Sequence, residues 1–199
     1  MNTRSVNRIH YAGDLRSDLI AEAVRVIAED GTAAVSLRAL TRTLGVSHAA
    51  PKNHFPTKEA LFAEIAREGF VEFAHRLNTA GDAARAAGGD PLAVLEAQGL
   101  AYLSFAEDRP SHFALMFRGD LFDPTIVIEE GLAAFETLYT SVTAAQAVGW
   151  HQGVDTLQVA MMVWSTVHGL ANLETQSLPP AVGTPNRVEI LRLALGTNA

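Results

Sequence analysis

The residues with the most evident chemistry lie in the segment LGVSHAAPKNHFPTKEALF, residues 44–62. His48 and Lys52 are four positions apart, so on a helix they share one face, with Asn53 beside them. In the major groove of DNA, a lysine can donate to O6 and N7 of guanine, and an asparagine can pair with adenine. Such a face could enter a major groove and read DNA bases. A polar face that only contacts water is the alternative, and the spacing alone favours it.

The spacing around this face is typical of a helix-turn-helix: a helix, a turn of about three residues that contains Gly45, and a short second helix. Val46 and Phe55 are the apolar residues expected to anchor the short helix. Ser47 is its expected N-cap, which makes Pro51 the fourth helical residue. A proline there forfeits about one hydrogen bond and stiffens the segment.

The residues next to the predicted reading face also suit a nucleic acid. Ala49 and Ala50 are small, which allows the backbone to approach a surface closely. Thr57 is the expected cap of the following helix, where unpaired N–H groups and the basic Lys58 suit a phosphate. We therefore expect contacts to both bases and phosphates from one short segment.

Composition and charge bound the class of protein. The chain has 199 residues, of which 48% are hydrophobic and 19% charged, as in an ordinary globular protein. Its net charge of −7 argues against a protein that coats nucleic acid. The charge is uneven, because residues 1–60 hold eight Lys and Arg against six Asp and Glu, whereas the rest holds seven against sixteen. This asymmetry suits a small DNA-binding module on an acidic body.

Apolar residues recur with helical period along nearly the whole chain, and strand-like alternation is almost absent, so the predicted fold class is all-α. We predict a helix-turn-helix DNA-binding domain over 1–60, with helices capped by Asp14, Ser36 and Ser47. Residues 61–199 are predicted to form a helical body on a long helix that starts at Thr57, and the resemblance described below implies that this body is an effector-binding and dimerisation domain. Further helices are expected at about 91–107, 110–118, 124–148, 153–175 and 184–196.

The segment 153–175 is apolar on two faces, which predicts burial on both sides, by the chain's own core and by a second surface. One thick monomeric core is the alternative. A pocket in the body would draw on aromatic and methionine side chains with few polar groups, and therefore suits a mostly apolar ligand. The same residues at helical spacing also suit a plain core. The candidates are Tyr102, Phe105, Phe113, Met116, Phe117, Met161, Trp164 and His168.

Several separated motifs resemble the tetracycline-repressor (TetR) family of transcriptional regulators. SLRALTRTL followed by GVSHAAPKNHFPTKEALF is similar to the family's helix-turn-helix. The resemblance extends to the branch named for a Trp-His-Gly motif, through YAGDLR at 11–16, PSHFALMF at 110–117 and WSTVHGLANLE at 164–174. It covers about residues 10–175.

The resemblance implies a homodimeric DNA-binding protein, usually a repressor that a small molecule releases from a near-palindromic operator in double-stranded DNA. It implies dimerisation through the last two helices, where Gly169 and Ala171 allow close approach. One position departs from the family, because Lys52 stands where an aromatic residue is usual, which puts the usual operator preference in doubt. The resemblance places Ser47, His48, Ala49 and Ala50 at bases, and Arg38, His54, Thr57 and Lys58 at phosphates.

Other classes of protein find little support in the sequence. It contains no nucleotide-binding or hydrolase motif, its seven histidines lack metal-ligand spacing, and cysteine is absent, so we expect no enzyme, cofactor or metal. A helical enzyme assembled from distant carboxylates is the unlikelier alternative. No apolar run is long enough for a membrane span, and we expect a cytoplasmic protein. A regulator without an effector, an activator, and a minor-groove arm carrying Arg4 and Arg8 stay open.

Overall fold

The computed structural model describes residues 14–47, 49–175, 183 and 186–197, and all regular structure within these ranges is helical. The prediction of an all-α fold is confirmed. In chain order the elements are α1 (Leu15–Asp30), the 3-10 helix η1 (Thr32–Ala34), α2 (Leu37–Thr43), the 3-10 helix η2 (Ala50–Asn53), α3 (Lys58–Ala86), α4 (Pro91–Asp108), α5 (Pro110–Met116), the 3-10 helix η3 (Pro124–Val127), α6 (Ile128–Ala147), α7 (Thr156–Thr175) and α8 (Arg187–Leu195).

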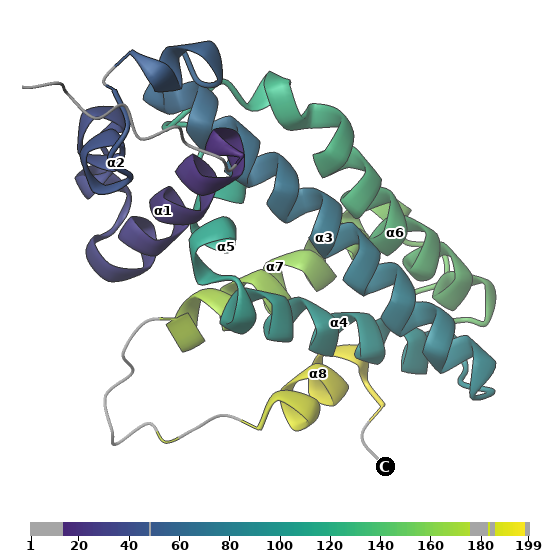
Figure 1. Ribbon diagram of the computed structural model, residues 1–199. Helices are drawn as coiled ribbons and strands as arrows, with labels where there is room; N and C mark the ends of the chain where they lie inside the picture. The colour runs from purple at the N-terminus through teal and green to yellow at the C-terminus, as the bar shows by residue number, and fades with distance from the viewer. Residues whose placement is uncertain (1–13, 48, 176–182, 184–185, 198–199) are drawn as a thin grey trace, which may run out of the picture.

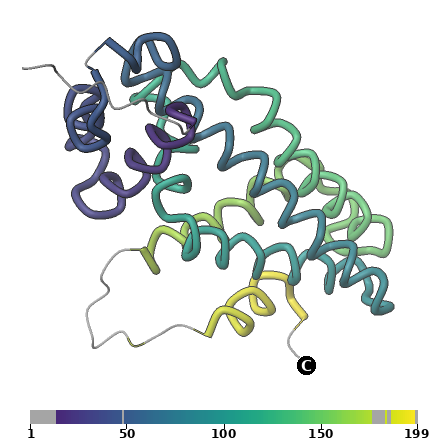
Figure 2. Tube along the Cα trace, in the orientation of Figure 1, coloured from purple at the N-terminus to yellow at the C-terminus, as the bar shows by residue number. Residues whose placement is uncertain are grey.

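The helices form a small N-terminal unit and a larger body connected by α3. Figure 1 shows α1 and α2 at one end of the molecule, with α3 running from that end along the body. In the body α3 packs on α4, α5 and α6, while α7 packs on α4 and α6. The trace in Figure 2 shows the short α8 at the C-terminal end, where it packs on α4 and α7. The predicted domain division at residue 60 falls in the first turn of α3.

Three helices begin at a side chain that caps them. Asp14 accepts a hydrogen bond from the backbone N–H of Arg16, Thr57 from that of Ala60, and Asp90 from that of Ala93. Each bond satisfies a donor that has no partner inside the helix. Ser36 is the N-cap residue of α2, as predicted, but its side chain makes no capping bond.

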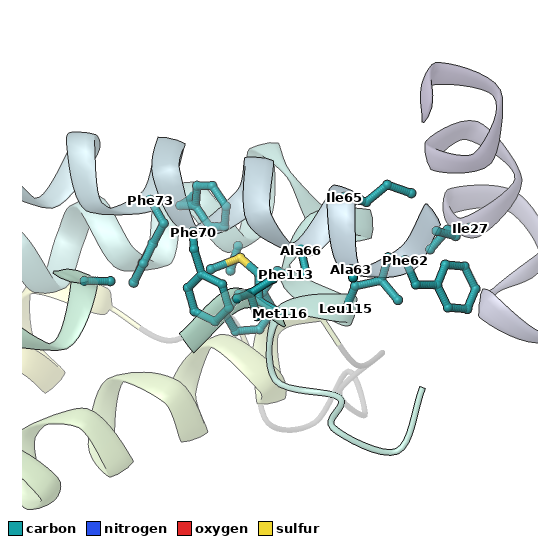
Figure 3. Close-up of a cluster of buried hydrophobic side chains, with 14 of the residues drawn as sticks. Ile27, Phe62, Ala63, Ile65, Ala66, Phe70, Phe73, Phe113, Leu115 and Met116 are labelled. Atoms are coloured by element: carbon teal, nitrogen blue, oxygen red, sulfur yellow. The ribbon is translucent and has the colours of Figure 1, made fainter. Parts of the chain in front are cut away.

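One hydrophobic core continues from the N-terminal unit into the body. Phe62 and Ile65 on α3 pack toward α1, and Phe70 and Phe73 lie further along the same helix (Figure 3). Met116 of α5 lies beside them and is buried. The N-terminal unit and the body are therefore packed on one continuous core.

Candidate functional site

The segment predicted to read DNA is a short 3-10 helix rather than an α-helix capped by Ser47. Its helical residues are Ala50–Asn53, and Ala49 occupies the capping position without a side-chain bond. Pro51 is buried, and its carbonyl oxygen accepts from the N–H groups of His54 at 2.8 Å and Phe55 at 2.7 Å. A 3-10 turn suits a segment this short, since its bonds close after three residues. Proline thus anchors the segment to the core and terminates it.

The side chains predicted to meet bases lie on the outside of this segment. Lys52 and Asn53 are exposed, as are Ser47 and Ala49, while Ala50 is half-buried. His48 lies outside the described residues, as do Arg4 and Arg8 of the predicted arm. The described part of the segment therefore presents a cation and an amide to solvent beside small residues.

The residues predicted to meet phosphates differ in availability. Arg38 and His54 are exposed. The hydroxyl oxygen of Thr57 accepts from the N–H of Ala60 and thereby caps α3. Lys58 Nζ donates to the carbonyl oxygen of Thr32 at 2.9 Å and lies 5.0 Å from the centre of the Phe62 ring. The ammonium of Lys58 thus binds within the protein, a role that sequence spacing did not indicate.

The body contains a cavity of about 530 Å³, between helices α3, α4, α6, α7 and α8. This volume is within the range of about 300–1,000 Å³ that small-molecule sites occupy. Among the described residues, no Arg, Lys, Asp, Glu or His lines it. The wall is largely apolar and aromatic, and includes Phe70, Phe73, Leu77, Phe135, Leu138 and Val163.

Four of the eight predicted pocket residues line this cavity: Tyr102, Met116, Phe117 and Trp164. Phe105 is fully buried in the core, and Phe113 and His168 lie behind the wall. Met161 is exposed and does not line the cavity, whereas its neighbour Met162 does. Successive helical residues point about 100° apart, so the prediction of which side of α7 faces the cavity selected Met161 instead of its neighbour Met162. Phe105, Phe113, Met161 and His168 therefore do not line the cavity.

A hydrogen-bond chain links three of the predicted residues. The indole N–H of Trp164 donates to the Tyr102 hydroxyl oxygen at 3.3 Å, and that hydroxyl lies 2.6 Å from His168 Nδ1. Because an indole N–H can only donate, the Tyr102 oxygen accepts from Trp164, and the direction of its bond with His168 depends on which ring nitrogen of His168 carries the proton. Burial raises the pKa of Tyr102 and lowers the pKa of His168, so both groups are uncharged. These two hydrogen bonds hold the Tyr102 side chain in position on the cavity wall.

Sequence reasoning missed Gln98, which also lines the cavity. It lies on α4 one turn before Tyr102 and is only 5% exposed. Its Oε1 is buried and has no hydrogen-bond partner. The available signal was a polar residue at helical spacing between Leu95 and Tyr102 on an otherwise apolar stripe.

Helix α5 lies between the cavity and the N-terminal unit. At its C-terminal end Met116 and the following Phe117 line the cavity. At its N-terminal end Ser111 Oγ donates to the carbonyl oxygen of Val24 in α1 at 2.8 Å. Gly69 of α3 leaves space for Met116, because a Cβ there would lie 2.8 Å from its sulfur. One short, buried helix thus contacts both parts of the molecule.

Helices α6 and α7 share a largely apolar outer surface. Leu132 and Tyr139 of α6 are exposed, as are Leu157, Met161 and Met162 of α7. Gly169, further along α7, is also exposed, and a Cβ there would meet nothing within 4 Å. By contrast, Leu193 is the one large apolar residue of α8 that is exposed among the described residues. Large exposed apolar patches typically mark protein interfaces.

Two kinds of site are absent from the part of the chain that the structure describes. No three His, Asp or Glu side chains there come together as metal ligands. Within the same residues, every helix is too short or too polar to span a bilayer.

Comparisons with known proteins agree with this architecture. Residues 19–65 match the family model of bacterial regulatory proteins, tetR family, and residues 95–193 match that of the tetracyclin repressor-like C-terminal domain. The chain belongs to the TetR family. It is therefore a helix-turn-helix DNA-binding transcriptional regulator and not an enzyme, as the sequence predicts. A comparison with curated proteins yields no match.

Solved structures of TetR type share the fold over most of the chain. A protein of unknown function from Rhodococcus sp. RHA1 is 32% identical, with 96% of each chain covered and a TM-score of 0.78. The TetR family regulator PfmR from Thermus thermophilus is 22% identical, covering 89% of this chain and 97% of its own, with a TM-score of 0.68. The ketosteroid regulator KstR2 of Mycobacterium tuberculosis is 16% identical, covering 92% and 94%, with a TM-score of 0.62.

Proposed function

We propose that this TetR-family chain is a homodimeric repressor that leaves a near-palindromic operator when a small, mostly apolar effector enters the cavity. The observation that carries the proposal is the position of α5. Its Met116 lines the cavity, while its Ser111 is bonded to α1 of the DNA-binding unit. A ligand that displaces Met116 therefore also changes the packing of α1. A regulator without an effector needs no such cavity.

The exposed residues of η2 and the turn before it would enter the major groove. Lys52 is the side chain suited to guanine, and Asn53 the one suited to adenine. Arg38 and His54 are exposed on either side and would meet phosphates. Ser47, His48, Ala49 and Ala50 would also face bases, and Thr57 would face a phosphate. The DNA-binding domain would comprise residues 1–60. Lys58 contributes chiefly to stability.

The dimer would form through the apolar surface of α6 and α7. The family resemblance implies an interface on the last two helices, which are α7 and α8, but the exposed apolar residues favour α6 in place of α8. A two-fold axis at this surface would repeat the recognition segment, so the operator half-sites would lie about 34–36 Å apart. Such a regulator works on DNA in the cytoplasm.

The finer position within the family rests on the aromatic cluster around Tyr102. Trp164 and His168 both hydrogen-bond its hydroxyl group, and Gly169 follows on the outer face of α7. We propose that the chain belongs to the branch named for the Trp-His-Gly motif. In that case the motif serves to orient a cavity residue.

The proposal is tested by fluorescence anisotropy of the purified protein on its own upstream intergenic DNA, with an unrelated duplex of equal length as control. Tight binding to the first duplex alone, with two protomers per site, is expected at two salt concentrations. Electrostatic binding weakens steeply with salt for both duplexes, so the difference between them isolates base reading. Equal, salt-sensitive binding to both duplexes contradicts a local operator.

A further inference from the structure

The cavity wall contains one polar group that the protein itself does not satisfy. Gln98 Oε1 is buried without a partner, although its residue is only 5% exposed. A buried amide oxygen without a hydrogen bond costs about 1–3 kcal/mol, so such groups are uncommon in folded proteins unless a ligand or water satisfies them. Because Gln98 lines the cavity, a small rotation of its amide would bring this oxygen within reach of a ligand.

The Gln98 amide lies between α3 and the cavity. Gly81 of α3 faces it, and a Cβ at that position would lie 2.8 Å from Gln98 Nε2. A residue larger than glycine at position 81 would therefore shift the amide, so the glycine leaves it room beside the cavity.

The other polar oxygens on the wall are acceptors as well. The Tyr102 hydroxyl is already engaged by Trp164 and His168, and Thr166 Oγ1 donates its proton to the carbonyl oxygen of Met162 at 3.0 Å. Thr166 Oγ1 therefore offers a ligand only a lone pair. Together with Gln98 Oε1, it favours a ligand that donates a hydrogen bond.

The absence of charged side chains from the described wall argues against a charged ligand. A carboxylate or phosphate inside this cavity would lose its hydration without gaining a cation, which costs several kcal/mol. An aliphatic or alicyclic alcohol carries no charge that would lose its hydration. Its body is apolar like the wall, and its hydroxyl group can donate the hydrogen bond as well as accept one.

We infer that the cavity takes an uncharged, largely apolar molecule whose hydroxyl group hydrogen-bonds the Gln98 amide. This inference rests on the proposed function, in which the cavity is the effector site. It adds the chemical class of the ligand and the residue that selects it.

The test measures dissociation constants of three probes of equal chain length by calorimetry: decanol, decyl methyl ether and decanoate. We expect decanol to bind about tenfold more tightly than the ether, which cannot donate, and decanoate to bind most weakly. Gln98→Leu removes the amide at similar volume and is expected to abolish the preference for decanol while changing ether binding less than about twofold. Leu95→Met, an apolar change on the same wall, should keep the preference.

The outcomes separate the inference from the proposed function. A decanol preference that persists in Gln98→Leu, or tightest binding of decanoate, overturns the inference. Failure of all three probes to bind a protein that still binds DNA overturns it as well and leaves DNA recognition standing. Decanol binding through Gln98 without any change in DNA affinity supports the inference and refutes release by an effector.

Discussion

Ser111 in α5 and Val24 in α1 are joined by a hydrogen bond of 2.8 Å, although 87 residues separate them in the chain. The bond connects the helix that ends at the cavity with the first helix of the DNA-binding unit. Both partners are helical, so a shift of α5 along its axis acts on a specific point of α1. This contact is a direct polar link between the two parts of the described structure.

Replacing Ser111 with Ala is expected to weaken the coupling between ligand and DNA. The variant loses one buried hydrogen bond, at a cost of about 1 kcal/mol in the free energy of unfolding. The measurement is the ratio of DNA dissociation constants with and without decanol, which should approach one. Ser104→Ala is the control, because it removes an exposed serine hydroxyl bonded to Asp108. An unchanged ratio in Ser111→Ala would place the coupling elsewhere.

Lys52 tests whether the exposed recognition segment reads sequence. Lys52→Ala should weaken binding to the operator by roughly 1–3 kcal/mol and leave binding to random DNA nearly unchanged. Anisotropy titrations on both duplexes at one salt concentration provide the comparison. An equal loss on both would reduce Lys52 to a phosphate contact.

Lys58 is expected to behave differently, because its ammonium donates to Thr32 and lies over Phe62. Lys58→Met keeps the stem and removes the charge, and should lower the free energy of unfolding by about 1–2 kcal/mol. Urea denaturation compares this variant with Lys52→Ala. Because Lys52 is exposed, its replacement should leave the free energy of unfolding unchanged. Unchanged stability combined with weaker DNA binding would restore the phosphate role.

A charge on the surface of α6 and α7 should prevent dimerisation. Met161→Glu would bury two unpaired carboxylates, one from each protomer, and weaken the dimer at least about tenfold. Leu193→Glu on α8 is the matched control, since that side chain is 67% exposed on the other candidate helix. Sedimentation equilibrium distinguishes the two. Dissociation by Leu193→Glu alone would assign the interface to α8.

His112 should make stability depend on mildly acidic pH. Burial lowers its pKa, Arg109 lowers it further and Glu72 opposes them, while its Nδ1 is buried without a partner. Below its ordinary pKa of about 6.5 the unfolded chain takes up a proton that the folded chain resists, so stability falls as pH falls toward the lowered value. His168 contributes in the same direction, because burial lowers its pKa too.

Urea denaturation at pH 7.5 and 5.5 measures this dependence. Each such histidine contributes at most about 1.4 kcal/mol per pH unit, so His112→Gln should flatten the profile by up to that amount. His75→Gln, on the exposed side of α3, is the control and should leave the slope unchanged. An unaltered slope in His112→Gln would mean that the folded protein accommodates the protonated ring.

Secondary structure and fold class followed from local features of the chain. Apolar residues at helical spacing, the caps Asp14, Thr57 and Asp90, and prolines at helix starts act within a few residues, so they are legible without the fold. The recognition segment was located for the same reason. Its 3-10 form was not, because the burial of Pro51 depends on what packs beneath it.

The chemistry of the site was decided by contacts between distant residues. Lys58 appeared free for a phosphate until the fold placed Thr32 next to it, and Met161 appeared to line a pocket until packing set the phase of α7. Gln98 became a candidate only because packing places it, buried, on the wall of an apolar cavity. The sequence by itself determined which helices form and what kind of protein they build. Tertiary packing alone decided which polar groups were left without a partner, since burial is a property of neighbours that the local pattern does not contain.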